Sequence, residues 1–275
     1  MNNSEPGRWA LWLSFPLAGI LAIASLGGLF LPSTYAAETR MQAALSIGND
    51  AGNLVVIVPV LMMAAILALR GSVAARLVWM GTLAYLVYDF LNYALAIHFN
   101  SMFLAYCGVL GLSFYALTGG LRALPTAEIA RRFGPRTPVK TTAVLLLLMS
   151  VITILHWLGD IVPALLVGGV PQAVRDSGLA TEGVAALDLT FGTPAFVIAA
   201  ILLLRRRPLG FVLGPVVLTF LVLSSLVLAP MGIAMARRGF GAGYTLGAIG
   251  LGIAAANAVL LILSLRVTKA TLQPV

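Results

Sequence analysis

The sequence has few charged residues and almost none of the residues that bind metals or form disulfides. Asp, Glu, Lys and Arg make up 9 % of its 275 residues, and it has one cysteine and two histidines. Soluble domains carry roughly 25 % charged residues, so the composition excludes an ordinary soluble fold. The single Cys107 excludes a disulfide framework and CxxC metal or redox motifs. We expect Cys107 to be a small apolar packing residue.

Hydrophobic residues are abundant instead. They make up 60 % of the chain, and the mean hydropathy is +1.02. That much apolar surface needs a lipid solvent, so we predict an all-α integral membrane protein whose main partner is the lipid bilayer. The formal net charge of +8 could indicate a nucleic-acid partner. In membrane proteins, however, Lys and Arg mark the cytoplasmic loops, and we expect no nucleic-acid binding.

Eight segments are long and apolar enough to form transmembrane helices, which need about 20 residues each. They are residues 9–31, 51–69, 74–97, 101–121, 141–166, 188–204, 209–236 and 242–265. The first segment exceeds the apolar region of a signal peptide, about 7–15 residues, so we expect it to be a retained helix. Residues 32–50 are more polar and are predicted to form a partly helical cap outside the membrane.

The distribution of Lys and Arg predicts the orientation of these helices. If the N-terminus is inside, five inner segments carry Arg8, Arg70, Arg76, Arg122, Arg131, Arg132, Arg136, Lys140, Arg205, Arg206, Arg207, Arg266 and Lys269. The outer segments carry only Arg40, Arg175, Arg237 and Arg238. Because positive residues favour the cytoplasmic side, we predict that both termini are cytoplasmic, and only the last pair of arginines disagrees.

An internal repeat is visible when the chain is shifted by 135 residues. Residues 54–70 then align without a gap with residues 189–205, and both segments place a proline, an Ala-Ala-Ile-Leu run and a final arginine in register. The same shift pairs Arg40 with Arg175 and Asn53 with Asp188. The pattern predicts two parallel four-helix repeats, residues 1–135 and 136–275. Such repeats commonly form a site at their interface, although a duplication can also leave no site.

One segment carries a polar stripe through a long apolar run. On a helix over residues 74–97, the spacing i, i+3, i+4, i+7 and i+8 places on one face Tyr85, Tyr88, Asp89, Asn92 and Tyr93. A carboxylate in a bilayer is costly, so Asp89 is expected to face the interior of the helix bundle. Asp89 is therefore our candidate for a charged binding residue, and the alternative is that the stripe only forms hydrogen bonds between helices.

Other polar residues are expected in the same outer half. Asp50 and Asn53 lie at the start of the second helix and Asp188 at the start of the sixth, where Asp could also be a helix cap. The face of the fifth helix carries His156 and Asp160, a second protonatable pair, together with Thr153 and Trp157. We therefore predict an outward-facing polar pocket between residues 51–69, 74–97, 141–166 and 188–204.

A metal site is not expected. A catalytic zinc site needs three protein ligands and an open position, whereas the two histidines, His98 and His156, lie at different depths. We expect no cofactor and assign no catalytic residue, because Walker A, GxSxG, HExxH and GxGxxG motifs are missing from the sequence.

The region around the polar stripe resembles a known family. The segments that carry the resemblance are residues 77–93, Phe99-Asn100, Phe103-Leu104-x-Tyr106, Leu187-Asp188-Leu189 and Pro194. They resemble a family of bacterial polytopic membrane proteins with no assigned activity. The resemblance implies a bacterial inner membrane location and adds weight to the two polar faces. It implies no substrate, cofactor or catalytic role.

Three functions remain open from the sequence. The first is binding or transport of a small solute or proton through the outward-facing pocket. The second is an intramembrane enzyme that acts on a lipid-type substrate, so enzyme activity stays undecided. The third is a structural subunit that binds an unknown protein partner. Bound metal would favour the enzyme, and a flux that depends on pH or ions would favour transport.

Overall fold

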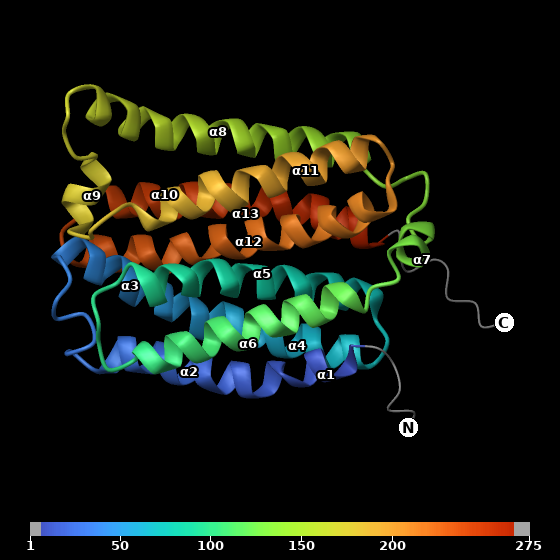
Figure 1. Cartoon of the computed structure of the whole chain (residues 1–275), viewed down its shortest axis with the longest axis horizontal. Coiled ribbons are helices and arrows are strands. Elements are labelled where there is room, and N and C mark those ends of the chain that lie inside the picture. Colours follow the sequence, from blue (N-terminus) through green and yellow to red (C-terminus); the bar gives the residue numbers. More distant parts are fainter. Residues whose placement is uncertain (1–6, 267–275) are drawn as a thin grey trace.

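The computed structural model describes residues 7–266, which fold into helices joined by turns and short loops, with no strand among them. The first half contains α1 (Arg8–Trp12), α2 (Ser14–Phe30), α3 (Arg40–Gly52), the π-helix η1 (Asn53–Ile57), α4 (Val58–Leu69), α5 (Val73–Leu95), α6 (Phe103–Arg122) and α7 (Thr126–Arg131). The second half contains α8 (Val139–Leu166), α9 (Gln172–Ser177), α10 (Gly183–Leu187), the π-helix η2 (Asp188–Gly192), α11 (Thr193–Leu204), α12 (Pro208–Arg237) and α13 (Ala242–Arg266). The long helices lie side by side along one axis (Figure 1).

Seven helices in the described part of the chain are long and apolar enough to cross a membrane. They are Arg8–Phe30, Arg40–Leu69, Phe103–Arg122, Val139–Leu166, Gly183–Leu204, Pro208–Arg237 and Ala242–Arg266. This finding supports a multi-pass membrane protein with an all-α fold. The helix α5 has 23 residues but is not among the seven, because Arg76, Asp89 and Asn92 reduce its hydropathy.

The second long helix begins eleven residues earlier than expected. Residues 40–50 belong to α3 rather than to an outer cap. The Thr39 side chain caps this helix by accepting a hydrogen bond from the Gln42 backbone N–H at 3.1 Å. Threonine followed three residues later by glutamine is a known helix-start pattern. Asp50 therefore lies inside a helix, and its interpretation as a cap was wrong.

Asp188 also lies inside a helical segment, because α10 begins at Gly183 and continues through η2 into α11. The cap interpretation was therefore wrong here too. In both long helices a π-helix interrupts the α-helix, at Asn53–Ile57 and at Asp188–Gly192. A π-helix has i→i+5 hydrogen bonds and is rare, and it often occurs at functional sites.

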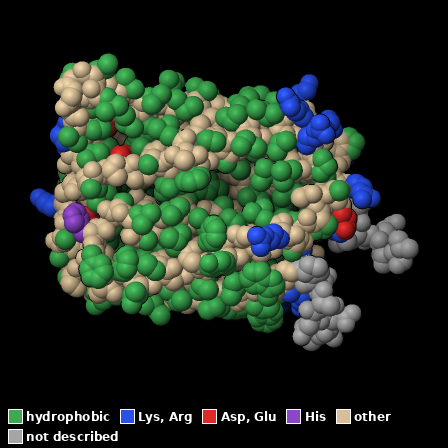
Figure 2. Space-filling model, viewed as in Figure 1, with side chains coloured by type: hydrophobic (Ala, Val, Ile, Leu, Met, Phe, Trp, Pro, Cys, Tyr) green, Lys and Arg blue, Asp and Glu red, His purple; other side chains and the backbone are tan. Residues whose placement is uncertain are grey.

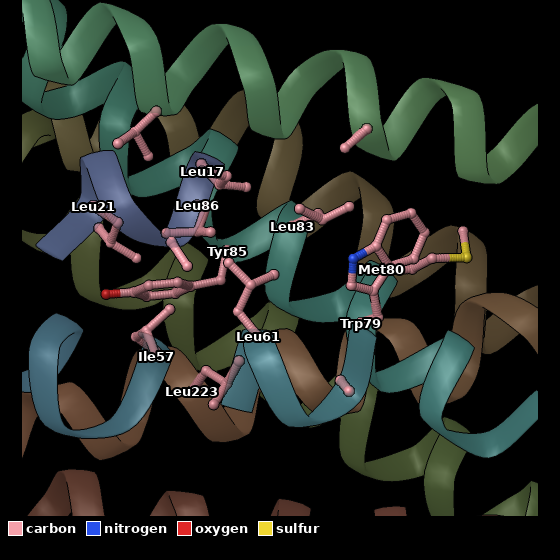
Figure 3. Packing of buried hydrophobic residues seen from close by; sticks show 14 of the residues in the cluster. Leu17, Leu21, Ile57, Leu61, Trp79, Met80, Leu83, Tyr85, Leu86 and Leu223 are labelled. Carbon is pink, nitrogen blue, oxygen red and sulfur yellow. The ribbon is translucent and has the colours of Figure 1, made fainter. Parts of the chain in front are cut away.

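Apolar side chains from both halves of the chain pack together in the interior. Figure 3 shows Tyr85 of α5 among residues of α2, η1, α4, α5 and α12, namely Leu17, Leu21, Ile57, Leu61, Leu86 and Leu223. Close packing of α5 on α12 depends on Gly81, because a Cβ at this position would collide with Thr219. The helix α5 is thus enclosed by its neighbours.

The surface between the two ends of the bundle is mostly hydrophobic (Figure 2). Cys107, which we expected to be a small apolar packing residue, is exposed on the surface of α6. One end, here called the α9 end, contains residues 31–39, 96–102, 167–182 and 238–241. The opposite α7 end contains residues 70–72, 123–138 and 205–207. Lys269, which contributed to the predicted orientation, lies outside the described residues.

Candidate functional site

The polar stripe lies on α5 as predicted, but its residues point to two different neighbours. Tyr85, Asp89 and Tyr93, each four residues apart, contact the junction of α3 and η1. Tyr88 instead reaches η2, where its hydroxyl group donates to Asp188. The stripe therefore contributes to two separate clusters on either side of α5.

The first cluster surrounds Asp89, whose exposed fraction is 9 %. The Asn49 side-chain amide donates to both carboxylate oxygens at 3.0 Å. The Asn53 amide donates to Asp89 Oδ2 at 2.9 Å. These donors are neutral, and no ion pair to Asp89 is present among residues 7–266. The Asp89 carboxyl group is therefore bonded by neutral amide groups, and no cationic side chain among the described residues pairs with it.

Two tyrosines complete this cluster, which we call the Asp89 network. The Tyr85 hydroxyl donates to Asn53 Oδ1 at 3.0 Å. The Tyr93 hydroxyl accepts from Asn49 at 3.1 Å and donates to the Ser46 carbonyl oxygen at 3.2 Å. These bonds hold both asparagines with their amide groups directed at Asp89. The network thus joins α5 to the α3–η1 junction.

Asn49 was missed by the sequence analysis. It lies four residues before Asn53, so on a continuous helix both side chains share one face. Because the expected second helix begins only at residue 51, the sequence prediction does not place Asn49 beside Asn53. The capping pattern of Thr39 and Gln42 was the signal that could have revealed it.

The second cluster surrounds Asp188, the first residue of η2. Asp188 Oδ1 accepts a hydrogen bond from the Tyr88 hydroxyl at 2.9 Å, and Asp188 Oδ2 accepts one from Trp157 Nε1 at 2.8 Å. We call these residues the Asp188 cluster. Tyr88 and Asp89 are neighbours on α5, yet each reaches a different π-helix. Asp188 is thus part of the bundle interior but not of the Asp89 network.

Asp50 forms a third, separate contact. Its exposed fraction is 1 %, and its Oδ2 accepts a hydrogen bond from the Tyr35 hydroxyl at 2.5 Å. Burial is the main cause that raises the pKa of the Tyr35 phenol, so this group stays protonated and continues to donate. A Cβ at Gly28 would collide with the same carboxylate. Asp50 is therefore enclosed by α2 and the 31–39 loop.

The predicted pair of His156 and Asp160 does not form a hydrogen bond in the described part of the chain. Asp160 accepts hydrogen bonds from the backbone N–H groups of Gln172 and Ala173 at 3.0 and 3.1 Å. It therefore binds the first turn of α9, where a carboxylate is favourable. The His156 ring contacts the ring of its neighbour Trp157, with 4.7 Å between the centroids.

Asn92 is the remaining member of the predicted stripe. Its Oδ1 atom is buried and has no hydrogen-bond partner among residues 7–266. The side chain lies against the start of α10, because a Cβ at Gly183 would be 2.7 Å from this oxygen. Asn92 therefore faces the second half of the chain, as Tyr88 does.

A cavity of about 290 Å³ leads to Asp89. Its polar lining comes from α3, α5, α9 and the segment before α10, and includes Ser46, Asn49, Asp89, Tyr93, Asp176 and Glu182. Desolvation raises the pKa of the Glu182 carboxyl, against hydrogen bonds from the backbone of Val184 and Ala185 that lower it. Of the ten predicted pocket residues, Asp89 and Tyr93 line this cavity. Tyr85 and Asn53 do not line it, but Asn53 donates to Asp89 and Tyr85 donates to Asn53.

The described residues contain no group of three His, Cys, Asp or Glu side chains that could hold a metal ion. Comparisons with known proteins add no assignment, because no family model, no curated protein and no solved structure matches the chain. The function is therefore inferred from the geometry of the Asp89 network and its cavity.

Proposed function

We propose that α5 also crosses the membrane, which makes eight transmembrane helices with both termini cytoplasmic. The helix has 23 residues, enough to span about 30 Å of hydrocarbon at 1.5 Å per residue. It begins at the α7 end, after Arg70, and its polar side chains face other helices. The arginines of residues 123–138 and 205–207 also lie at the α7 end. The positive-inside rule makes this the cytoplasmic side, and the family resemblance suggests the inner membrane of a bacterium.

The proposal includes an internal duplication. The two π-helices, Asn53–Ile57 and Asp188–Gly192, are 135 residues apart, the same shift that aligns the two sequence halves. The same offset relates α4 with α11 and the starts of α5 and α12. A π-helix contains one extra residue relative to an α-helix and is rare. Its recurrence at the same repeat position supports two parallel four-helix repeats.

The function we propose is binding or transport of a small cation or proton from the α9 end. One observation carries this proposal: a buried carboxylate, Asp89, forms part of the wall of a cavity and has only neutral hydrogen-bond donors around it. An isolated charge within a membrane costs several kcal/mol. A cation or proton in the cavity would offset this cost, and Asp176 and Glu182 on the same wall would attract it.

The experiment that tests this function is a flux assay with the full-length protein in lipid vesicles. Alkali cations and small protonated amines are supplied on the outside, and internal pH and cation uptake are measured. We expect Asp89→Asn to abolish a flux that the wild-type protein supports. The matched control is Glu128→Gln, because Glu128 is exposed on α7 and, within residues 7–266, its one ion pair is with Arg132. Equal flux in the wild type and Asp89→Asn would contradict the proposal.

A second function is favoured by the same hydrogen bonds. Asp89 joins α5 to both α3 and η1, so it could act as a structural fastener in a subunit without a solute. Hydrogen bonds between membrane helices contribute about 0.6 kcal/mol on average. A fastener predicts that Asp89→Asn lowers stability, whereas a binding role predicts lost flux with stability retained.

A further inference from the structure

A second, apolar cavity lies in the membrane-spanning part of the molecule. It is a groove of about 740 Å³ between α6 and α11, and its floor is formed by α5 and α12. Figure 1 shows α6 and α11 on the same side of the bundle. The lining is dominated by large apolar side chains, among them Leu110, Phe114, Leu121, Phe191, Phe196 and Phe220. Phe114 and Phe191 are more than half exposed, so the groove opens sideways toward lipid.

One end of this groove meets the Asp188 cluster. Tyr88 and Gly192 both line the groove. The Tyr88 hydroxyl holds Asp188 Oδ1, and a Cβ at Gly192 would lie 3.4 Å from the same oxygen. Because Gly192 has no side chain, nothing from this residue covers Oδ1 on the groove side. Asp188 itself does not line the groove, and its carboxylate lies behind the wall at Gly192.

The Asp188 carboxylate can accept further hydrogen bonds, and no cationic side chain among the described residues forms an ion pair with it. Its two described donors, Tyr88 and Trp157, are both neutral, and no ion pair to it exists among residues 7–266. Each carboxylate oxygen can accept about two hydrogen bonds, so one site on each oxygen remains. A protonated amine would supply both the donor and the charge.

The groove lining is mostly apolar, and the Asp188 cluster lies at one level of it. Asp188 lies five residues after the start of α10, about 8 Å below the α9 end at 1.5 Å per residue. From there the apolar lining continues to Leu121 and Leu213, near the α7 end. This arrangement matches a molecule with a polar head near one membrane surface and a tail directed toward the other.

We propose that the groove binds an amphiphile with one long hydrocarbon tail and a protonated amine head, which pairs with Asp188. The groove volume lies within the range of ligand pockets, about 300–1,000 Å³. The inference goes beyond the proposed solute function and is independent of it, because it involves neither Asp89 nor its cavity. A second copy of the chain is the other occupant to test, because a helix can also pack into a groove between helices.

The test uses the full-length protein in phosphatidylcholine vesicles and three photoreactive probes with one identical long alkyl tail. The probes carry a primary amine, an alcohol or a carboxylic acid as the head, and labelled peptides are identified by mass spectrometry. We expect the amine probe to label α6 and α11, and the acid probe to label them about tenfold less, equivalent to about 1.4 kcal/mol. Equal labelling by all three probes would overturn the assigned head group.

Two variants locate the site. Gly111 lines the groove and has open space where a Cβ would be, so Gly111→Trp should fill the groove and remove the labelling. The matched control is Gly252→Trp on α13, which also has open space but lies outside the groove. Labelling that survives Gly111→Trp would overturn the location. A change of oligomeric state in Gly111→Trp alone would identify a second copy as the occupant and would also overturn the proposal.

The contribution of Asp188 is measured with Gly192→Ala and Asp188→Asn. The added methyl group of Gly192→Ala makes an ordinary contact at 3.4 Å and shields Asp188 Oδ1, so labelling by the amine probe should fall to the level of the alcohol probe. Asp188→Asn should have the same effect by removing the charge. An unchanged preference for the amine in both variants would contradict the pairing. If Asp188→Asn does not fold, the alanine variant and the probe comparison still decide.

Discussion

The two π-helices begin with residues of opposite hydrogen-bonding roles, a donor in η1 and an acceptor in η2. The first residue of η1 is Asn53, which donates to the carboxylate of Asp89 on α5. The first residue of η2 is Asp188, whose carboxylate accepts from Tyr88 on α5. Each contact between α5 and a π-helix therefore contains one carboxylate and one neutral donor. Two facing carboxylates would repel each other at this depth, and this pairing avoids that arrangement.

The two contacts also differ in their surroundings. Asn53 is fully buried and is held by Tyr85, so the contact beside η1 is enclosed by protein. Asp188 is only half-buried, and its Oδ1 lies behind Gly192 in the wall of the apolar groove. The enclosed contact beside η1 should therefore be more sensitive to substitution than the contact beside η2. The variants below test this difference.

The largest effect is expected when the enclosed contact receives a second carboxylate. In Asn53→Asp, two carboxylates would meet where the present bond to Asp89 measures 2.9 Å. Uncompensated charge in a buried network costs about 3 kcal/mol or more, and we expect a correspondingly lower midpoint of thermal unfolding in detergent. The reciprocal change, Asp188→Asn, should cost less, about 1–2 kcal/mol, because the amide oxygen can still accept from Tyr88 and only the bond from Trp157 Nε1 is lost. A larger loss in Asp188→Asn would reverse the comparison.

A smaller effect is expected at the glycines that accompany the two π-helices. A Cβ at Gly52 would lie 2.9 Å from Val227 Cγ1, so Gly52→Ala should lower the free energy of unfolding by about 1–3 kcal/mol. Gly192→Ala makes a contact at 3.4 Å and gains up to about 1 kcal/mol in helix propensity. Thermal unfolding of both variants measures the two changes in stability. An equal loss of stability in Gly52→Ala and Gly192→Ala would contradict the prediction.

The smallest effect is expected at the two tyrosines. Tyr85→Phe leaves the buried Asn53 Oδ1 without its donor at 3.0 Å, and we expect a loss of about 1 kcal/mol. Tyr88→Phe removes a donor from Asp188, which keeps the bond from Trp157 and is only half-buried, so the loss should be smaller. The two variants are compared by unfolding in the same detergent, and the account fails here if Tyr88→Phe is the less stable.

The polar stripe of α5 could be predicted because helical spacing alone places its members near one face. Its division between two neighbours could not, because it depends on which helices lie beside Tyr88 and Asp89. The start of α3 was placed wrongly because residues 40–50 are less apolar than a typical span, although the pattern of Thr39 and Gln42 marked the helix start.

Other features required the three-dimensional structure. The spacing of His156 and Asp160 suggested a pair, but the chain turns back after α8 and brings the backbone of Gln172 to Asp160. A π-helix adds one residue without a signature in composition, so neither η1 nor η2 was expected. The shift of 135 residues did pair Asn53 with Asp188, the residues at which the two π-helices begin.

The most direct test of the central claim is the thermal stability of Asp89→Asn in detergent, measured from about pH 5 to pH 8 beside the wild type and Glu128→Gln. An asparagine oxygen in the place of Asp89 Oδ2 can still accept from Asn49 and Asn53, so only the bond from Asn49 to Oδ1 is lost while the carboxylate charge is removed. A carboxylate kept for binding usually reduces stability, so the account predicts unchanged or higher stability in this variant. A clear loss of stability would contradict it and identify Asp89 as a fastener of the bundle.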